Sequence, residues 1–349
     1  MKIVGGNSTC STPSECCSEG VSLLRVQNLT VQYGIEGIEF TAVNDISLAI
    51  APGEIVGLLG ESGCGKTTAA LSLLRVLPKA ATVAAGSAIF GGRDLLLLNE
   101  SQLRAIRGAQ IAMIYQDSSV LNPVIRVGSQ VCEVLRAHTT YGLNQARDKA
   151  RTLFASIGLG EFERIYDAYP HQLSGGQRQR IAVAQALVCD PLLVIADEPT
   201  ASVDPGTAGE ILDCMRRMKE SAHTSFLVIS HDPDALAAVA DRIIVMYAGQ
   251  IVEDGPLAEV YSRPLHPYTQ ALLQCSPKRA RFQGSARRQH LPCIPGHSPD
   301  PAELFPGCSF ANRCKDRMQI CDVGSPRSFQ TSRNRSARCF KYDGRSEYV

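Results

Sequence analysis

The segment Gly60-Glu61-Ser62-Gly63-Cys64-Gly65-Lys66-Thr67 constrains this chain more than any other. It fits the pattern G-x-x-x-x-G-K-[ST], follows the apolar run IVGLLG and precedes a segment of helical pattern. Glycines let backbone N–H groups curl around phosphate oxygens, and the helix start adds positive potential. Lys66 would reach the β- and γ-phosphates, and the Thr67 hydroxyl would ligate Mg²⁺. We therefore predict a nucleoside triphosphate site on an α/β fold.

Composition favours one or two well-filled globular domains, because 44% of the 349 residues are hydrophobic and the net charge is only +1. The longest apolar runs, such as LLVIA and RIIVMYA, are far shorter than the ~20 residues of a membrane-spanning helix. The first residues lack the apolar region of a secretory signal. We expect a cytoplasmic chain that reaches a membrane only through a partner.

Sequence patterns divide the chain into three regions. Residues 1–21 are rich in Ser, Gly, Thr and Cys without periodicity and are predicted to be a flexible tail. Residues 22–262 combine alternating strands near the start, a mostly helical insert at about 97–175, and short apolar strands of a covered parallel sheet. Residues 263–349 contain Pro and Cys with little periodicity and are predicted to form a small second domain.

Two adjacent carboxylates, Asp197 and Glu198, follow the apolar run LLVIA at the end of a predicted strand. Taken alone, such a pair is more often a cap or a solvated turn. Beside a phosphate loop, Asp197 is suited to the shell of a bound Mg²⁺, and Glu198 is suited to orienting or deprotonating the attacking water. The pair therefore predicts hydrolysis as well as binding.

The segment Leu173-Ser174-Gly175-Gly176-Gln177 opens another predicted helix. A Ser hydroxyl and free N–H groups at the positive end of a helix form a second anion-binding site. One chain has no obvious second phosphate to place there. We therefore expect this helix start to face a nucleotide held by another subunit.

In the order of these segments the chain resembles the ATP-binding cassette (ABC) family over about residues 22–262. The resemblance implies a P-loop NTPase fold with a RecA-like core, an antiparallel β subdomain and a helical subdomain. The matching motifs are the P-loop at 60–67 followed by Thr68, the Q-loop Gln116, the signature at 173–177, Asp197 with Glu198, the D-loop Ser202-Val203-Asp204, and the switch His231.

The resemblance also implies roles for single residues. Gln116 would join Thr67 and Asp197 at Mg²⁺, and His231 would contact the γ-phosphate opposite Glu198. An aromatic residue ahead of the P-loop would stack on adenine; Tyr33 is the first choice, and Phe40 is the alternative.

Assembly follows from the same resemblance. ATP would lie between the P-loop of one subunit and the signature residues Ser174, Gly175, Gly176 and Gln177 of the other, in a head-to-tail dimer. The D-loop Asp204 belongs to the same dimer, and hydrolysis would need both subunits.

ABC ATPases of nucleic-acid maintenance are the competing class. By family resemblance, members of that class carry arms or zinc modules inserted inside the cassette. In this chain the segment from Gln116 to Ser174 is short. That size resembles the helical insert that docks a membrane subunit. Transport is therefore favoured, and no nucleic-acid partner is expected.

The end of the chain narrows the class of transporter. The segments HPYTQALLQCSP and FPGCSFANRCKDRMQIC resemble the extension of oligopeptide/dipeptide permease ATPase subunits, some of which handle nickel or other small solutes. Asn312 and Ser298 depart from that pattern, because Pro is usual at both positions. We expect peptide import, with nickel or another small solute as the alternative cargo.

Cysteines in this extension raise the question of a metal. Cys308, Cys314, Cys321 and Cys339 could together hold Zn²⁺ or an iron–sulfur cluster, or remain plain buried thiols. The gaps between them are wider than the ~2–4 residues usual within a zinc-ligand pair. The resembled subfamily holds a four-iron four-sulfur cluster here, so that cluster is expected and zinc is the alternative.

The expected complex follows from this resemblance. The cofactors are ATP and Mg²⁺. The expected partners are a second, related ATPase subunit, two transmembrane permease subunits and an extracytoplasmic substrate-binding protein. The chain would lie at the cytoplasmic face of the inner membrane.

Overall fold

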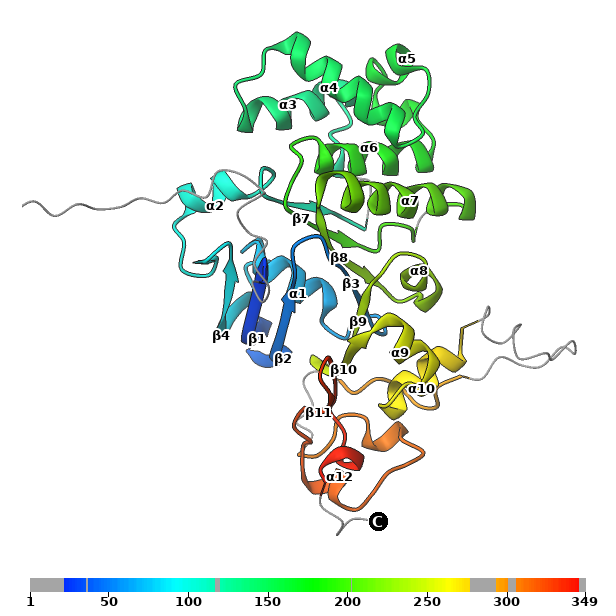
Figure 1. Cartoon of the computed structure of the whole chain (residues 1–349). Helices are drawn as coiled ribbons and strands as arrows, with labels where there is room; N and C mark the ends of the chain where they lie inside the picture. Colours follow the sequence, from blue (N-terminus) through cyan, green and yellow to red (C-terminus); the bar gives the residue numbers. More distant parts are fainter. Residues whose placement is uncertain are drawn as a thin grey trace, which may run out of the picture.

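The computed structural model describes residues 22–35, 37–116, 120–201, 203–276, 293–300 and 306–344. The tail predicted at residues 1–21 lies outside them. Figure 1 shows a lobe of helices at one end, two sheets in the middle and the Cys-rich extension at the opposite end. This arrangement contains the predicted α/β core, antiparallel β subdomain and helical subdomain.

The central sheet has eight strands in the order β11-β12-β10-β9-β3-β8-β7-β6. Strands β9, β3, β8, β7 and β6 run parallel, and β10 turns back antiparallel to β9. The bounds are β3 Ile55–Leu59, β6 Ile111–Ile114, β7 Leu193–Asp197, β8 Ser225–Ser230, β9 Arg242–Tyr247, β10 Gln250–Pro256, β11 Phe329–Ser332 and β12 Arg335–Ala337.

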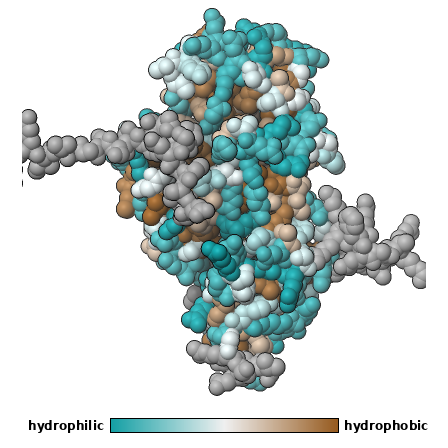
Figure 2. Space-filling view, viewed as in Figure 1, coloured by the Kyte–Doolittle hydropathy of each residue, from teal (hydrophilic) through white to brown (hydrophobic). Residues whose placement is uncertain are grey.

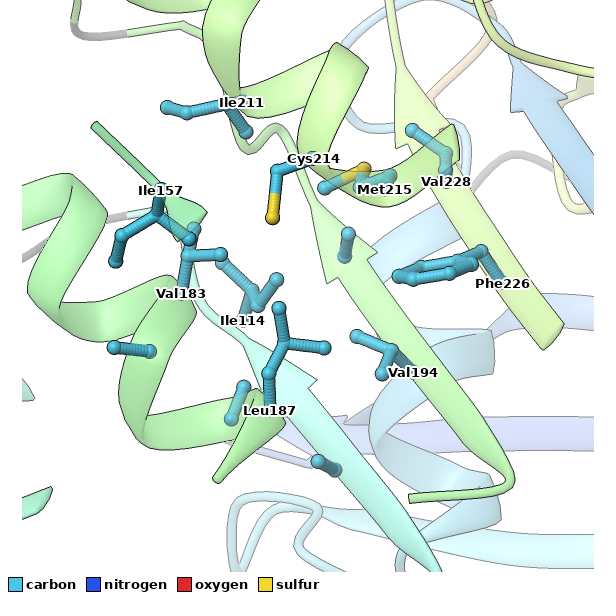
Figure 3. Packing of buried hydrophobic residues seen from close by; sticks show 14 of the residues in the cluster. Ile114, Ile157, Val183, Leu187, Val194, Ile211, Cys214, Met215, Phe226 and Val228 are labelled. Atoms are coloured by element: carbon cyan, nitrogen blue, oxygen red, sulfur yellow. The ribbon is translucent and has the colours of Figure 1, made fainter. Parts of the chain in front are cut away.

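The parallel strands are apolar without a break because both faces of the sheet are covered. In β8, Phe226 and Val228 belong to the core on one face, while Leu227 and Ile229 belong to the core on the other. The first face packs against helices α6 (Gly175–Leu187) and α7 (Pro205–Ala222), as Figure 3 shows. Because successive side chains of a strand point to opposite faces, alternate residues of β8 pack into two different cores.

A second sheet is antiparallel, with the order β2-β1-β4-β5, as predicted for its first two strands. It shares the second core with helix α1, which follows β3. The bounds are β1 Leu24–Ile35, β2 Ile38–Ile50, α1 Lys66–Leu73, β4 Ala81–Phe90 and β5 Arg93–Asp94. This packing places β1 and β2 beside the start of α1.

The helical insert contains one strand that the sequence did not predict. Strand β6 pairs with β7 in the central sheet, with Ile114 opposite Ala196. A run of four residues, IAMI, is too short for its periodicity to distinguish strand from helix. The helices of this insert are α2 Glu100–Ile106, which lies beside the antiparallel sheet in Figure 1, and α3 Val127–His138, α4 Leu143–Ser156, α5 Phe162–Tyr166 and the 3₁₀ turn η3 Pro170–Gln172.

The C-terminal extension continues the central sheet, because β12 pairs with β10. Glu253 lies opposite Ala337 in that pairing. The remaining elements are α8 Pro233–Ala237, α9 Leu257–Ser262, α10 Pro267–Gln274, η4 Ala311–Arg313, α12 Ile320–Val323 and η5 Phe340–Tyr342. Whether residues 263–349 form a domain of their own stays a prediction.

Among the coloured residues of Figure 2, hydrophobic residues gather in separate patches on the face that is drawn. Within the described ranges, the structure has no helix long and apolar enough to cross a membrane.

Candidate nucleotide site

The phosphate loop joins the end of β3 to α1, as predicted. Two of its glycines are required by close contacts: a Cβ on Gly60 would lie 2.3 Å from the carbonyl oxygen of Met246, and one on Gly65 would lie 2.4 Å from that of Ala42. Gly65 also has φ +102, which L side chains rarely adopt. The loop is therefore packed between the two sheets in a shape that only glycine permits.

Lys66 lies folded against the loop. Its side chain is buried, and Nζ donates to the carbonyl oxygens of Gly60 and Glu61 at 2.8 and 2.9 Å. Cys64 is also buried, and burial raises the pKa of its thiol. The cation is thus held at the centre of the curled backbone, where it can meet phosphate oxygens.

Asp197 ends β7 next to the start of α1. Thr67 Oγ1 donates to Asp197 Oδ2 at 2.7 Å, whereas Oδ1 is buried and has no partner among the described atoms. Burial raises the pKa of this carboxyl group. A hydroxyl and a carboxylate oxygen without a partner are the hard oxygen donors that Mg²⁺ prefers, so the residues present fit this ion.

Gln116 is placed at the same edge of the sheet. It follows β6 by two residues, and β6 pairs with β7 so that Ile114 is opposite Ala196, the neighbour of Asp197. Its side chain is exposed. The parallel pairing therefore brings the predicted Q-loop residue to the carboxyl end of the strand beside Asp197.

Glu198 and His231 are in direct contact. His231 Nδ1 lies 2.7 Å from Glu198 Oε1, and the backbone N–H of His231 donates to the same oxygen at 2.9 Å. Ser230 Oγ donates to the other oxygen at 3.4 Å. Glu198 has φ +48, an uncommon conformation for a residue other than glycine. Strain at this position is consistent with a residue held for function.

Of the two candidate aromatics, Tyr33 lies beside the start of α1, and Phe40 lies against Tyr33. Tyr33 and Phe40 stack with ring centroids 5.4 Å apart, because β1 and β2 pair these residues directly. The Tyr33 hydroxyl lies 3.3 Å from Thr68 Oγ1 at the start of α1. Tyr33 is thus the ring in contact with the P-loop helix.

The signature segment forms the start of α6. Ser174 Oγ accepts from the N–H of Gln177, and Gln177 Oε1 accepts from the N–H of Ser174. Ser174 and Gly175 are exposed, while a Cβ on Gly176 would lie 3.2 Å from Thr207 of α7. Ser174 and Gln177 therefore cap the start of this helix with their own hydrogen bonds. Ser174 and Gly175 remain accessible at the surface.

The D-loop residue Asp204 lies on the other side of Thr207. It caps α7 by accepting from the N–H groups of Gly206 and Thr207, and Thr207 Oγ1 donates to its second oxygen. Thr207 therefore contacts Asp204 and lies against Gly176. The preceding D-loop residue, Ser202, lies outside the described residues.

The sequence missed the contact between the extension and the phosphate loop. Arg313 and Ser298 donate to the Glu61 carboxylate, and Tyr268 accepts from its N–H. The segments carrying these residues were recognised by their pattern. Nothing in that pattern says that they touch residue 61.

The four predicted cysteine ligands line one small cavity, which His266 and Phe310 also line. These ligands are Cys308, Cys314, Cys321 and Cys339. Burial raises the pKa of the Cys308 thiol to about 11. Over the described ranges, however, no group of three or more His, Cys, Asp or Glu side chains is placed to hold a metal ion. The cysteines share a cavity, but the expected cluster or zinc is not supported by their geometry.

Comparison with known proteins decides the family. The ABC transporter family model matches residues 43–201, and that of the oligopeptide/dipeptide transporter C-terminal region matches residues 252–321. A Brucella abortus protein named as a peptide import ATP-binding protein is 41% identical to this chain over 318 residues. The match covers 91% of this chain and 94% of that protein. The chain belongs to the ABC transporter ATP-binding proteins.

Other ABC relatives agree. A Sinorhizobium fredii protein named as a peptide ABC transporter ATP-binding protein is 40% identical over 322 residues, covering 91% of this chain and 95% of that protein. Among solved structures, the ATP-binding cassette MJ0796, a dimer with ADP and Pi, superposes with a TM-score of 0.62 at 26% identity. The match covers 67% of this chain and 98% of that one. The chain is thus an ABC ATPase whose ATP hydrolysis is coupled to transport.

Proposed function

We propose that this ABC ATPase energises the import of dipeptides and oligopeptides. The observation that carries the proposal is the matched C-terminal region, which in the structure is joined to the ATPase core through the central sheet. The relatives named for peptide import match the chain over both the cassette and this extension.

Within the ATP site, each residue has a proposed task. The N–H groups of the loop at 60–67 and the Lys66 ammonium would bind the phosphates, and Tyr33 would stack on adenine. Thr67, Gln116 and Asp197 would hold Mg²⁺, which supplies charge neutralisation of the phosphates when it is bound. These three residues would thereby help to position the triphosphate for attack by a water molecule.

Hydrolysis is assigned to Glu198. Its carboxylate would accept the proton of the attacking water, and the contacts from His231 and Ser230 hold it in one orientation. His231 would also contact the γ-phosphate, which ties the orientation of the base to the presence of ATP.

A second subunit completes the site. The exposed start of α6 at Ser174 and Gly175 has no phosphate of its own chain to bind, so it would close over the ATP of a partner cassette. The Thr207 contacts link this surface to Asp204, so both motifs would meet the partner together. We infer that the partner is a related second ATPase subunit.

The wider complex would contain two transmembrane permease subunits and an extracytoplasmic substrate-binding protein. The chain would sit at the cytoplasmic face of the inner membrane, held by its helical lobe. Substrate choice would belong to the other subunits.

The proposal predicts substrate-dependent ATPase activity in the reconstituted complex. With the permease encoded beside this gene in lipid, binding protein loaded with a short peptide is expected to raise the ATPase rate above that with empty binding protein. ATP hydrolysis is followed as released phosphate. Stimulation by nickel-loaded protein but not by peptide would contradict peptide import while leaving the ATPase intact.

We also propose that the four cysteines around the extension cavity hold a four-iron four-sulfur cluster, with zinc as the alternative. The four thiols line a single cavity, although among the described residues no three such side chains are placed to hold a metal ion, so the proposal rests on the resemblance of the extension. The bound group would cross-link segments of the extension that have little regular structure.

This proposal predicts that Cys308→Ser loses the iron, the sulfide and the visible absorbance of anaerobically purified protein. Cys293→Ser is the matched control, because Cys293 is exposed and does not line the cavity. Zinc without iron in the wild type would select the alternative. Unchanged metal content in Cys308→Ser would exclude a ligand role for that residue.

A further inference from the structure

Among the described residues, the C-terminal extension makes hydrogen bonds to the phosphate loop at Glu61. The two Nη atoms of Arg313 donate to the two carboxylate oxygens, at 2.8 and 3.0 Å, and Ser298 Oγ donates to one of them at 2.7 Å. The Tyr268 phenol oxygen accepts from the Glu61 N–H at 2.9 Å. Side chains from three separate segments after the cassette thus converge on the second residue of the loop.

Arg313 is fixed from several sides. Its side chain is only 7% exposed, its Nε donates to the carbonyl oxygen of Pro295 at 2.9 Å, and Nη1 donates to the Tyr247 hydroxyl at 3.3 Å. Phe310, directly before η4, packs edge-on against Tyr247 and Tyr268 with centroids 5.2 and 5.4 Å away. A bidentate pair whose arginine is already immobilised loses little side-chain entropy, so it is stronger than an ordinary surface ion pair.

Glu61 also contacts Lys66, the lysine of the phosphate loop. Its backbone carbonyl oxygen accepts a hydrogen bond from Lys66 Nζ at 2.9 Å, so the residue that Arg313 contacts also positions the Lys66 ammonium. Burial alone would raise the pKa of Glu61, but hydrogen bonds from Arg313 and Ser298 bring it below the usual value. Glu61 is therefore ionised, and its negative charge lies in the loop that must hold a polyanion.

We propose that Arg313 is a positioning residue for ATP: through Glu61 it holds the phosphate loop in shape and cancels a carboxylate charge that would repel the triphosphate. The inference rests on the ATP site proposed above, and it assigns that site a dependence on residues beyond the cassette.

The charge argument gives a test with a specific sign. Arg313→Ala is expected to raise KM for ATP about tenfold, which corresponds to one charge contact of 1.4 kcal/mol, with a smaller change in kcat. Adding Glu61→Gln removes the uncompensated charge and is expected to lower KM again by at least about threefold. If Arg313 had only a structural role, removing the charge of residue 61 would not lower the KM for ATP of Arg313→Ala.

The measurement is the ATPase rate of the reconstituted complex as a function of ATP, together with equilibrium binding of a fluorescent ATP analogue to the full chain. Arg317→Ala is the matched control, because Arg317 lies in the same segment but pairs with the exposed Asp322. It should keep the wild-type KM. Arg313→Lys keeps the charge but not the two-pronged contact, and an intermediate KM is expected.

The outcomes separate this inference from the ATP site itself. An unchanged KM in Arg313→Ala, or a raised KM that Glu61→Gln does not lower, overturns it. Lys66→Ala tests the site: if that variant bound ATP normally, the proposed site would fail irrespective of Arg313. Should Arg313→Ala melt early by circular dichroism, the comparison of Arg313→Lys with and without Glu61→Gln decides the question.

Discussion

Glu198→Gln is expected to lower the ATP turnover rate by a factor of about 10²–10⁴, the usual contribution of a general base, while ATP binding is retained. The amide has nearly the shape of the carboxylate and still accepts a hydrogen bond, so the contacts from His231 and Ser230 can persist. It cannot accept the proton of the water. ATP should then be bound and not released, so the cassette dimer accumulates.

Two measurements check this result. Released phosphate gives the turnover rate, and gel filtration with ATP and Mg²⁺ shows the trapped dimer. Glu220→Gln is the matched control, because Glu220 is exposed near the end of α7 and belongs to none of the motifs of the site. Near-normal turnover in Glu198→Gln would remove this residue from the role of base.

Local sequence was sufficient for the parts of the site that depend on contiguous motifs. The loop at 60–67 is predicted because its residue types and its strand and helix neighbours are adjacent in the chain. Asp197 and Glu198 are predicted because a short apolar strand ends in two acids. The structure places them beside Thr67 and His231 through sheet pairing, and parallel pairing is the consequence of apolar runs covered on both faces.

The contacts that the sequence could not predict are long-range. Nothing near Glu61 indicates an arginine 252 positions later, and nothing near Arg313 indicates its carboxylate. Strand β6 was hidden in a helical insert because four apolar residues fit either structure. The added strand β12 has three residues, too few for a strand pattern, and it is ordered by an ion pair with β10.

That ion pair explains how the extension is attached to the core. Glu253 is 0% exposed and accepts from Arg335 Nη2 at 2.8 Å and from the N–H groups of Leu265 and His266, both at 2.9 Å. One carboxylate therefore joins β12, β10 and the turn before α10. Since α10 carries Tyr268, the same group supports the contact with the phosphate loop.

Glu253→Ala is accordingly expected to lower the free energy of unfolding by about 3–5 kcal/mol, because it leaves the Arg335 guanidinium buried without its carboxylate. Glu259→Ala is the control: its carboxylate is 3.8 Å from Arg335 and 53% exposed, so a change below about 1 kcal/mol is expected. Denaturant unfolding gives the free energies, and amide hydrogen exchange over residues 329–337 locates the loss. Equal effects of the two substitutions, or unchanged exchange in β11 and β12, would show that the extension is held to the core by packing rather than by this buried pair.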